Sequence, residues 1–176
     1  MALERNVEIK ACLRNPGHAR ETARRLAGGD GEILEQEDIF FRVPEGRLKL
    51  RILHPDHGEL IFYRRADQKS ARLSSYSIST TREPGRLSEV LSLALGRRAV
   101  VRKKRELYLV GQNRIHLDSV EGLGDFLEIE FVMRPGDTEA DGERTVAELM
   151  TILEIRPEDL LDVAYVDLLE ADPHMI

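Results

Sequence analysis

Residues 6–13 read NVEIKACL, and polar and apolar side chains alternate along them. The polar positions at the start are Asn6, Glu8 and Lys10, and apolar residues stand between them. A period of two predicts a β-strand, which normally turns its apolar side to a core and its charged side to water. The charged side would form a site only if it faced an enclosed cavity, so the rest of the sequence must decide between these environments.

At least five predicted strands share this division into an apolar and a charged face. Beyond the first strand, the polar side chains that share a face are Arg47, Lys49 and Arg51; Tyr63 and Arg65; Arg114, His116 and Asp118; and Glu128 and Glu130. The strand expected over residues 99–110 leaves two choices, because either Lys103 and Arg105 or Arg102 and Lys104 share the face of interest.

The predicted elements are those of an α+β protein with about eight strands and four helices. Helices are expected within residues 15–29, 83–97, 144–155 and 157–171, and Pro157 suits the first turn of the last one. The connections between strands are mostly short, which favours an antiparallel sheet. A sheet with that many strands tends to curl or to close into a barrel.

Composition excludes several classes of protein. The net charge of −6 argues against nucleic-acid binding through global charge, and the single Cys12 excludes an intrachain disulfide or a multi-cysteine metal site. No apolar run approaches the ~20 residues of a membrane span, and the N-terminus lacks the hydrophobic core of a signal peptide. We therefore expect a soluble, cytoplasmic protein with no nucleic-acid or membrane partner.

Two arrangements of the sheet fit the pattern. In an open sheet, the charged face would be solvated; in a closed sheet, the charges would point inward and helices would cover the apolar outside. The charges are sorted by strand, since RLKLR at 47–51 is basic and FLEIE at 126–130 is acidic. A solvated face usually mixes signs, because like charges side by side repel. Sorting favours the inward arrangement modestly, and both remain open on the pattern alone.

An enclosed set of this kind would suit a metal ion and a phosphate chain. Arg and Lys bind phosphate oxygens, and carboxylates bind hard cations such as Mg²⁺ or Mn²⁺. Nothing in the sequence matches the GxxxxGK[ST] loop of nucleotide-binding proteins. Side chains, and not a helix N-terminus, would therefore hold the phosphates.

The sequence also resembles a known family. NVEIK looks like the ExExK signature of the CYTH superfamily, the triphosphate tunnel metalloenzymes, and further blocks resemble that family in its order: LKLR, LIFYRRADQ, RLSSY, VVRKKRELY, IHLDSVEGLGDFLEIE and AYVDLL. The resemblance is nearest to the class IV adenylate cyclase-like or thiamine triphosphatase-like subgroup. It implies a single CYTH-like domain over residues 1–176, folded as a closed or nearly closed eight-stranded antiparallel β-barrel with a charged tunnel inside and helices packed outside.

The resemblance also implies roles for individual residues. Metal ligands for Mg²⁺ or Mn²⁺ would be Glu8, Asp118, Glu128 and Glu130, with Asn6 standing where the family has its first Glu. An amide oxygen can ligate a hard cation but brings no charge, so the number of metal ions stays open. From its place beside Asp118 on a charged strand, and not from the resemblance, His116 is expected to be a hydrogen-bonded structural partner in preference to a base or ligand.

The basic positions would bind the substrate. Lys49, Arg51, Arg65, Lys103 and Arg105 match the family's phosphate-binding residues, and parity adds Arg47 and Arg114. Tyr63 would either contact the substrate, by stacking on a base or binding phosphate, or pack as a barrel tyrosine. Parity with Tyr63 also selects Arg65 over Arg64 as the inward side chain. The residues expected to take part in catalysis are Lys10, Glu8 and Arg105.

The leading functional prediction is a metal-dependent hydrolase of a triphosphate-containing small molecule. Inorganic tripolyphosphate, a nucleoside triphosphate and thiamine triphosphate are all possible substrates. The alternatives are a class IV adenylate cyclase, which converts ATP to cyclic AMP and pyrophosphate, and a non-catalytic module that binds polyphosphate or nucleotide. The protein is expected to be a monomer or a homodimer.

Overall fold

The computed structural model describes residues 3–171, and eight antiparallel strands in it form a closed barrel in the order β1-β5-β4-β3-β2-β6-β7-β8. The strands are β1 (Glu4–Cys12), β2 (Glu32–Phe41), β3 (Arg47–His54), β4 (His57–Arg65), β5 (Arg72–Thr81), β6 (Arg97–Val110), β7 (Asn113–Val120) and β8 (Gly124–Val132). The helices are α1 (Pro16–Ala27), α2 (Pro84–Leu95), α3 (Glu139–Ile152) and α4 (Tyr165–Ala171), with a 3₁₀ turn η1 at Pro157–Asp159. The expected α+β barrel is therefore confirmed.

The first strand closes the barrel. Glu8 lies opposite Arg72 of β5 on one side and opposite Glu130 of β8 on the other. The strands that begin and end the sheet in sequence are thus neighbours in space, and every strand edge in the barrel is paired.

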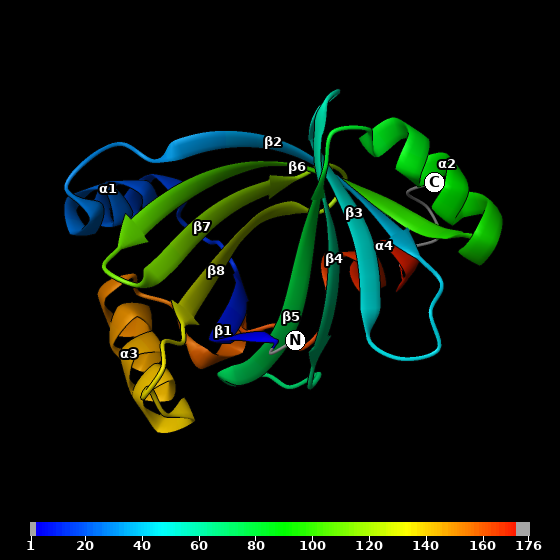
Figure 1. Cartoon of the computed structure of the whole chain (residues 1–176). Coiled ribbons are helices and arrows are strands. Elements are labelled where there is room, and N and C mark those ends of the chain that lie inside the picture. The colour runs from blue at the N-terminus through cyan, green and yellow to red at the C-terminus, as the bar shows by residue number, and fades with distance from the viewer. Residues whose placement is uncertain (1–2, 172–176) are drawn as a thin grey trace.

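The apolar face of the barrel points outward and is covered. Val7, Ile9 and Ala11 of β1 are at most 2% exposed, because they pack in a core with the helices. Three helices lie outside the barrel (Figure 1): α1 contacts β6 and β7, α2 contacts β2, β3 and β4, and α3 contacts β1 and β8. The charged faces of β1, β3 and β8 consequently point inward, whereas β2 and β6 carry charged side chains on both faces.

The C-terminal segment departs from the predicted single helix over 157–171. The 3₁₀ turn η1 ends at Asp159, Leu160 then forms a β-bridge with Ala11, and the N–H of Leu161 donates to the carbonyl of Lys10. Residues 160–161 are extended because they dock along the end of β1, and α4 begins only at Tyr165. The residue types here favour a helix, but backbone pairing with β1 holds residues 160–161 extended.

The helix expected from residue 144 begins earlier, at Glu139. Thr138 caps it by accepting from the N–H of Asp141, whose carboxylate accepts in turn from the N–H of Thr138. This reciprocal capping box satisfies two backbone donors that a helix start leaves free. Part of the acidic segment 136–143, which lies before the expected helix, is therefore helical.

The last segment also covers one end of the barrel. Ala164, Tyr165 and Val166 are at most 5% exposed and pack against apolar residues at the strand ends, namely Phe40, Val101, Val120 and Phe126. Because β2 and β7 end there and β6 and β8 begin there, these residues form a floor at that end.

Helix α3 can lie against the barrel only through a glycine. A Cβ on Gly142 would stand 2.5 Å from Cγ2 of Val7, which is fully buried, and 3.1 Å from Phe131. We expect Gly142→Ala to lower the free energy of unfolding by about 1–3 kcal/mol in urea denaturation, despite the better helix propensity of alanine. Gly85→Ala in α2, where a Cβ meets nothing within 4 Å, is the matched control and should be neutral or stabilising. Equal effects of the two substitutions would contradict this account of the packing.

Candidate active site inside the barrel

The barrel encloses a cavity of about 490 Å³ whose floor includes Ala164 and Tyr165. Seven of its lining side chains are basic and five are acidic. The basic ones are Lys10, Lys49, Arg51, Arg65, Lys103, Arg105 and Arg114, and the acidic ones are Glu8, Asp38, Glu59, Glu128 and Glu130. Positive charge therefore exceeds negative charge on this wall, although the whole chain carries −6. A wall of this sign favours an anion.

A buried carboxylate organises the largest group of cations. Asp38, 2% exposed, accepts hydrogen bonds from Lys49 at 2.8 Å and from Nε and Nη2 of Arg51 at 2.8 and 3.0 Å, and Lys103 lies 3.8 Å away. Burial alone would raise the pKa of Asp38, but Arg51, Lys49 and Lys103 outweigh it and hold that pKa well below its usual value. The carboxylate is thus ionised and has more cations around it than it can neutralise.

Burial and the neighbouring cations lower the pKa values of the two lysines in this group. Burial, together with the charge of Arg51, lowers the pKa of Lys49 to about 7, against the attraction of Asp38. Burial also lowers the pKa of Lys103, to which Arg105 and Arg51 contribute. An anion placed between these side chains would favour their charged forms, so the group is prepared for a ligand that brings negative charge.

A second internal carboxylate holds Arg105. Nε and Nη2 of Arg105 each donate to Asp118 at 2.6 Å, and the hydroxyl of Tyr165 donates to the same carboxylate at 3.0 Å. Burial would raise the pKa of Asp118, but Arg105 and Lys103 lower it below its ordinary value. This fork holds the guanidinium beside Tyr165, and its Nη2 also donates to Glu128 at 2.8 Å.

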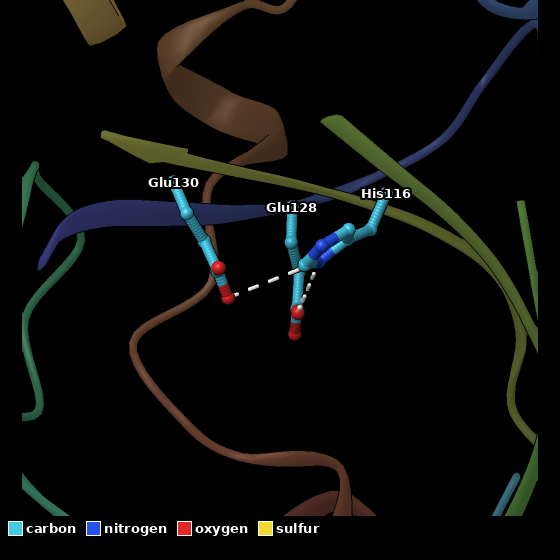
Figure 2. Close-up of side chains that lie close together, drawn as sticks. All are labelled: His116, Glu128 and Glu130. Atoms are coloured by element: carbon cyan, nitrogen blue, oxygen red, sulfur yellow. Dashed lines mark hydrogen bonds and ion pairs between the residues drawn. The ribbon is translucent and has the colours of Figure 1, made fainter. Parts of the chain in front are cut away.

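Across the cavity, β7 and β8 bring together His116, Glu128 and Glu130, as Figure 2 shows. One ligand atom from each lies within 4.8 Å of the others. His116 Nδ1 is 3.4 Å from Glu128 and 3.8 Å from Glu130. An imidazole and two carboxylates at this spacing form a donor set that a divalent cation can use.

Glu128 is shared between this set and the cations. Its oxygens lie 2.9 Å from Lys10 and 2.8 Å from Arg105. Burial would raise the pKa of Glu128, yet Lys10 and Arg105 hold it well below its usual value. Burial also lowers the pKa of Lys10 to about 8, and the charges of Arg65 and Lys103 add to that effect. The Lys10 ammonium lies 3.3 Å from the centre of the Tyr165 ring.

The first-strand residues complete the wall. Glu8 accepts from Arg65 at 2.5 Å, and Asn6 is 4% exposed with its Oδ1 lacking a partner among the described residues. Arg72, 1% exposed, donates from Nη1 to the carbonyls of Leu161 and Asp162 at 3.1 Å. Arg72 thereby ties the C-terminal segment to β5.

Most residues predicted for the site line this one cavity. Those brought together are Asn6, Glu8, Lys10, Lys49, Arg51, Tyr63, Arg65, Lys103, Arg105, Arg114, Glu128 and Glu130. The open choice in β6 is resolved, because Lys103 and Arg105 point inward and Arg102 pairs outside with Glu37.

Two predicted residues lie elsewhere. Arg47 is outside the cavity lining and pairs with Asp67 at 3.1 Å and Asp167 at 2.9 Å. Asp118 is behind the wall, with its oxygens occupied by Arg105 and Tyr165, which favours a supporting role over metal ligation.

Sequence reasoning missed Asp38 and Tyr165, and it favoured a structural role for His116 over a role as base or ligand. The charge-sorted strands drew attention to basic and acidic runs, and Asp38 stands in EILEQEDIFF, where acids occur at both parities. A signal for His116 was present, because it shares the parity of Arg114 and Asp118 on one strand.

Comparison with known proteins identifies the family to which this chain belongs. The CYTH domain matches residues 4–165, which include every residue that lines the cavity. The chain belongs to the CYTH domain family. The comparison with curated proteins gives no match.

Solved structures show the same CYTH fold. The PH1012 protein from Pyrococcus horikoshii OT3 has a TM-score of 0.81 at 22% identity, covering 93% of this chain and 98% of that one. The PH1819 protein from the same organism has a TM-score of 0.66 at 25% identity, with coverages of 94% and 98%. A Vibrio parahaemolyticus protein described as a candidate adenylate cyclase has a TM-score of 0.71 at 17% identity, with coverages of 94% and 97%. Among the described residues, no helix has the length and apolar character needed to span a membrane.

The role of Asp38 as internal counterion is testable through stability. Asp38→Asn leaves Lys49, Arg51 and Lys103 buried without their carboxylate. We expect the free energy of unfolding to fall by about 3–5 kcal/mol, as when one partner of a buried ion pair is removed. Urea denaturation followed by circular dichroism measures the change.

The neighbouring residue supplies the control. Glu37 points outward from the same strand and pairs with Arg102, whose side chain is 58% exposed. Glu37→Gln should cost less than about 1 kcal/mol, because solvent screens such a pair. A loss for Asp38→Asn no larger than that for Glu37→Gln would contradict the counterion role.

Proposed function

We propose that this protein hydrolyses a triphosphate-containing small molecule in a reaction that depends on Mg²⁺ or Mn²⁺. The observation that carries the proposal is the cavity wall, where seven basic side chains face a set of carboxylates inside a chain of net charge −6. CYTH family members are triphosphatases or adenylate cyclases, which agrees with a polyanionic substrate.

The phosphate chain would lie between the two halves of the wall. Lys49, Arg51 and Lys103, held by Asp38, would take phosphate oxygens on one side. Arg105, fixed by Asp118, would take them near the floor, and Arg65 would do so from β4. Arg binds phosphate through a planar fork and Lys through a point charge, so the group can follow several phosphate units.

His116, Glu128 and Glu130 would hold the metal ion, with Glu8 close by as the residue opposite Glu130. The donor set fits, since its three ligand atoms already converge and Glu130 makes only the longer contacts, 3.6 Å to Arg114 and 3.8 Å to His116. Carboxylates suit Mg²⁺ and Mn²⁺, and an imidazole ligand shifts the preference toward Mn²⁺. A bound divalent cation would supply positive charge to the phosphate oxygens.

The reaction itself needs little from the protein beyond placement and charge. A water oxygen adds to the terminal phosphorus, the bond from that phosphorus to the bridging oxygen breaks, and orthophosphate, the shortened phosphate and a proton leave. Arg105 and the lysines would stabilise the negative charge on the leaving oxygen. Lys10, bound to Glu128 at 2.9 Å, would orient the attacking water.

An assay with two substrates separates the candidate functions. Pure protein incubated with Mn²⁺ or Mg²⁺ and either tripolyphosphate or ATP should release orthophosphate, measured colorimetrically. Cyclic AMP together with pyrophosphate from ATP would identify an adenylate cyclase in its place. Binding of both compounds with no product would identify a non-catalytic binding module.

Glu130→Gln tests the metal set. The substitution keeps the shape and removes one negative ligand, so we expect turnover to fall by at least about 100-fold, with weaker Mn²⁺ binding by electron paramagnetic resonance. Glu121→Gln, in the exposed turn after β7, makes the same chemical change away from the cavity and should alter neither quantity. Full activity with unchanged Mn²⁺ affinity in Glu130→Gln would remove Glu130 from the site.

The lowered pKa of Lys49, about 7 in the free protein, predicts proton uptake on binding. A polyanion beside Lys49 raises that pKa, so the lysine gains a proton at pH 8, and affinity should fall as the pH rises from 6 to 9. Asp38, Arg51 and Lys103 face the same ammonium and set its starting value.

Calorimetry of tripolyphosphate binding in EDTA, in buffers of different ionisation enthalpy, counts the protons. Lys49→Arg should take up fewer, by up to about one proton at pH 8, because arginine stays charged. Subtracting the two proteins removes the titration of tripolyphosphate itself. Equal uptake by both proteins would contradict the prediction.

A further inference from the structure

The same cavity carries an apolar surface that a chain of phosphates cannot use. Five aliphatic side chains line the end of the cavity away from Tyr165, and we call them the apolar mouth patch: Leu34, Leu53, Ile78, Leu107 and Leu109. They come from β2, β3, β5 and β6. Ile78 and Leu109 are 41% and 60% exposed, so this end of the cavity opens to solvent.

Polarity changes in the same order along three of these strands. In β6, Leu109 and Leu107 at the mouth are followed inward by Arg105 and Lys103. Leu109 stands four residues beyond Arg105, or about 13 Å along an extended strand.

The neighbouring strands repeat the order. In β2, Leu34 precedes Gln36 and Asp38, and in β3, Leu53 is followed inward by Arg51. Leu34 lies opposite Arg105, which makes it a diagonal neighbour of Leu107 across the strand pair. The charged zone is therefore continuous with an apolar zone nearer the solvent.

The two ends of the cavity fix the direction of entry. The floor residues Ala164 and Tyr165 are at most 5% exposed, whereas the mouth is open. A ligand with a phosphate chain must enter through the mouth with its terminal phosphate first, because the cations lie deep. Whatever group the phosphates are attached to then lies against the apolar mouth patch.

We propose that the substrate of this site is a phosphate ester of an aliphatic group, with a hydrocarbon chain next to its phosphates, an inference that rests on the proposed triphosphate site. The hydrocarbon would remove the exposed leucine and isoleucine surface from water, which is favourable in proportion to the area covered. Inorganic tripolyphosphate would leave this surface wet. A nucleoside would place part of its hydroxyl and ring-nitrogen surface against these aliphatic side chains, which make no hydrogen bonds, while Arg114, opposite Leu109, offers donors beside the patch.

A series of ligands with one head group tests the proposal. Methyl, butyl and octyl triphosphate, inorganic tripolyphosphate and ATP are compared by calorimetric Kd in EDTA and by kcat/KM with Mn²⁺. Each methylene that enters the mouth should tighten binding by about two- to fourfold, so octyl triphosphate should bind at least about tenfold more tightly than methyl triphosphate. It should also bind more tightly than ATP.

Variants connect the effect to the patch. Leu109→Asn, at the most exposed of the five positions, and Leu34→Asn should both reduce the ratio of methyl to octyl Kd by several-fold. Ile33→Asn is the matched control, because Ile33 is 51% exposed on the outer face of the same strand as Leu34. That substitution should leave the ratio as it is.

The outcomes separate this inference from the function on which it rests. Tripolyphosphate turnover with equal affinity for methyl and octyl triphosphate would overturn the inference and leave the triphosphatase proposal standing. Tighter binding of ATP than of octyl triphosphate would overturn it in favour of a nucleotide. A dimer that Leu109→Asn dissociates, with no dependence on chain length, would assign the patch to a second copy of the chain. No interaction with any of the five compounds would overturn both proposals.

Discussion

Charges enclosed in a barrel must be compensated inside it, and this constraint explains much of the cavity. Moving an ion from water into a protein interior costs several kcal/mol even after relaxation. Two internal carboxylates meet that cost for the cations: Asp38 binds Lys49 and Arg51, and Asp118 binds Arg105. Neither group of cations is fully neutralised, because Lys103 is near both carboxylates. An anionic ligand in the cavity would neutralise the positive charge that remains.

The carboxylates inside the barrel therefore have two different roles: some act as counterions for the cations, and others form the candidate metal set. Asp38 and Asp118 are at most 2% exposed and serve the cations, while Glu128 and Glu130 share their edge of the cavity with His116. Glu128 belongs to both groups, since it contacts Lys10, Arg105 and His116. This shared residue connects the candidate metal set to the cations of the cavity wall through direct ion pairs.

The sequence predicted the barrel and most of its lining because a period of two leaves a direct trace in each strand. NVEIK and RLKLR each indicate which residues share a face. The pattern alone left an open and a closed sheet possible, and the resemblance to the CYTH family implied the closed barrel. The same reasoning failed for Asp38, whose burial depends on its place opposite Arg51 in a pairing that spacing along one strand does not show. It failed for Tyr165 because tertiary contacts with Lys10 and Asp118, and not a local pattern, place that ring in the floor.

Closure between β1 and β8, with a floor added by Ala164 and Tyr165, has a consequence for synthesis of the chain. During translation, β1 is made before the other strands. Its edge that pairs with β8 stays unpaired until β8, the last strand, has been made. Contacts of such long sequence separation form slowly, since the loop between them must be closed before any pairing rewards it. The barrel can thus close only after β8 has been made, and the cavity gains its floor only once Ala164 and Tyr165 have been added.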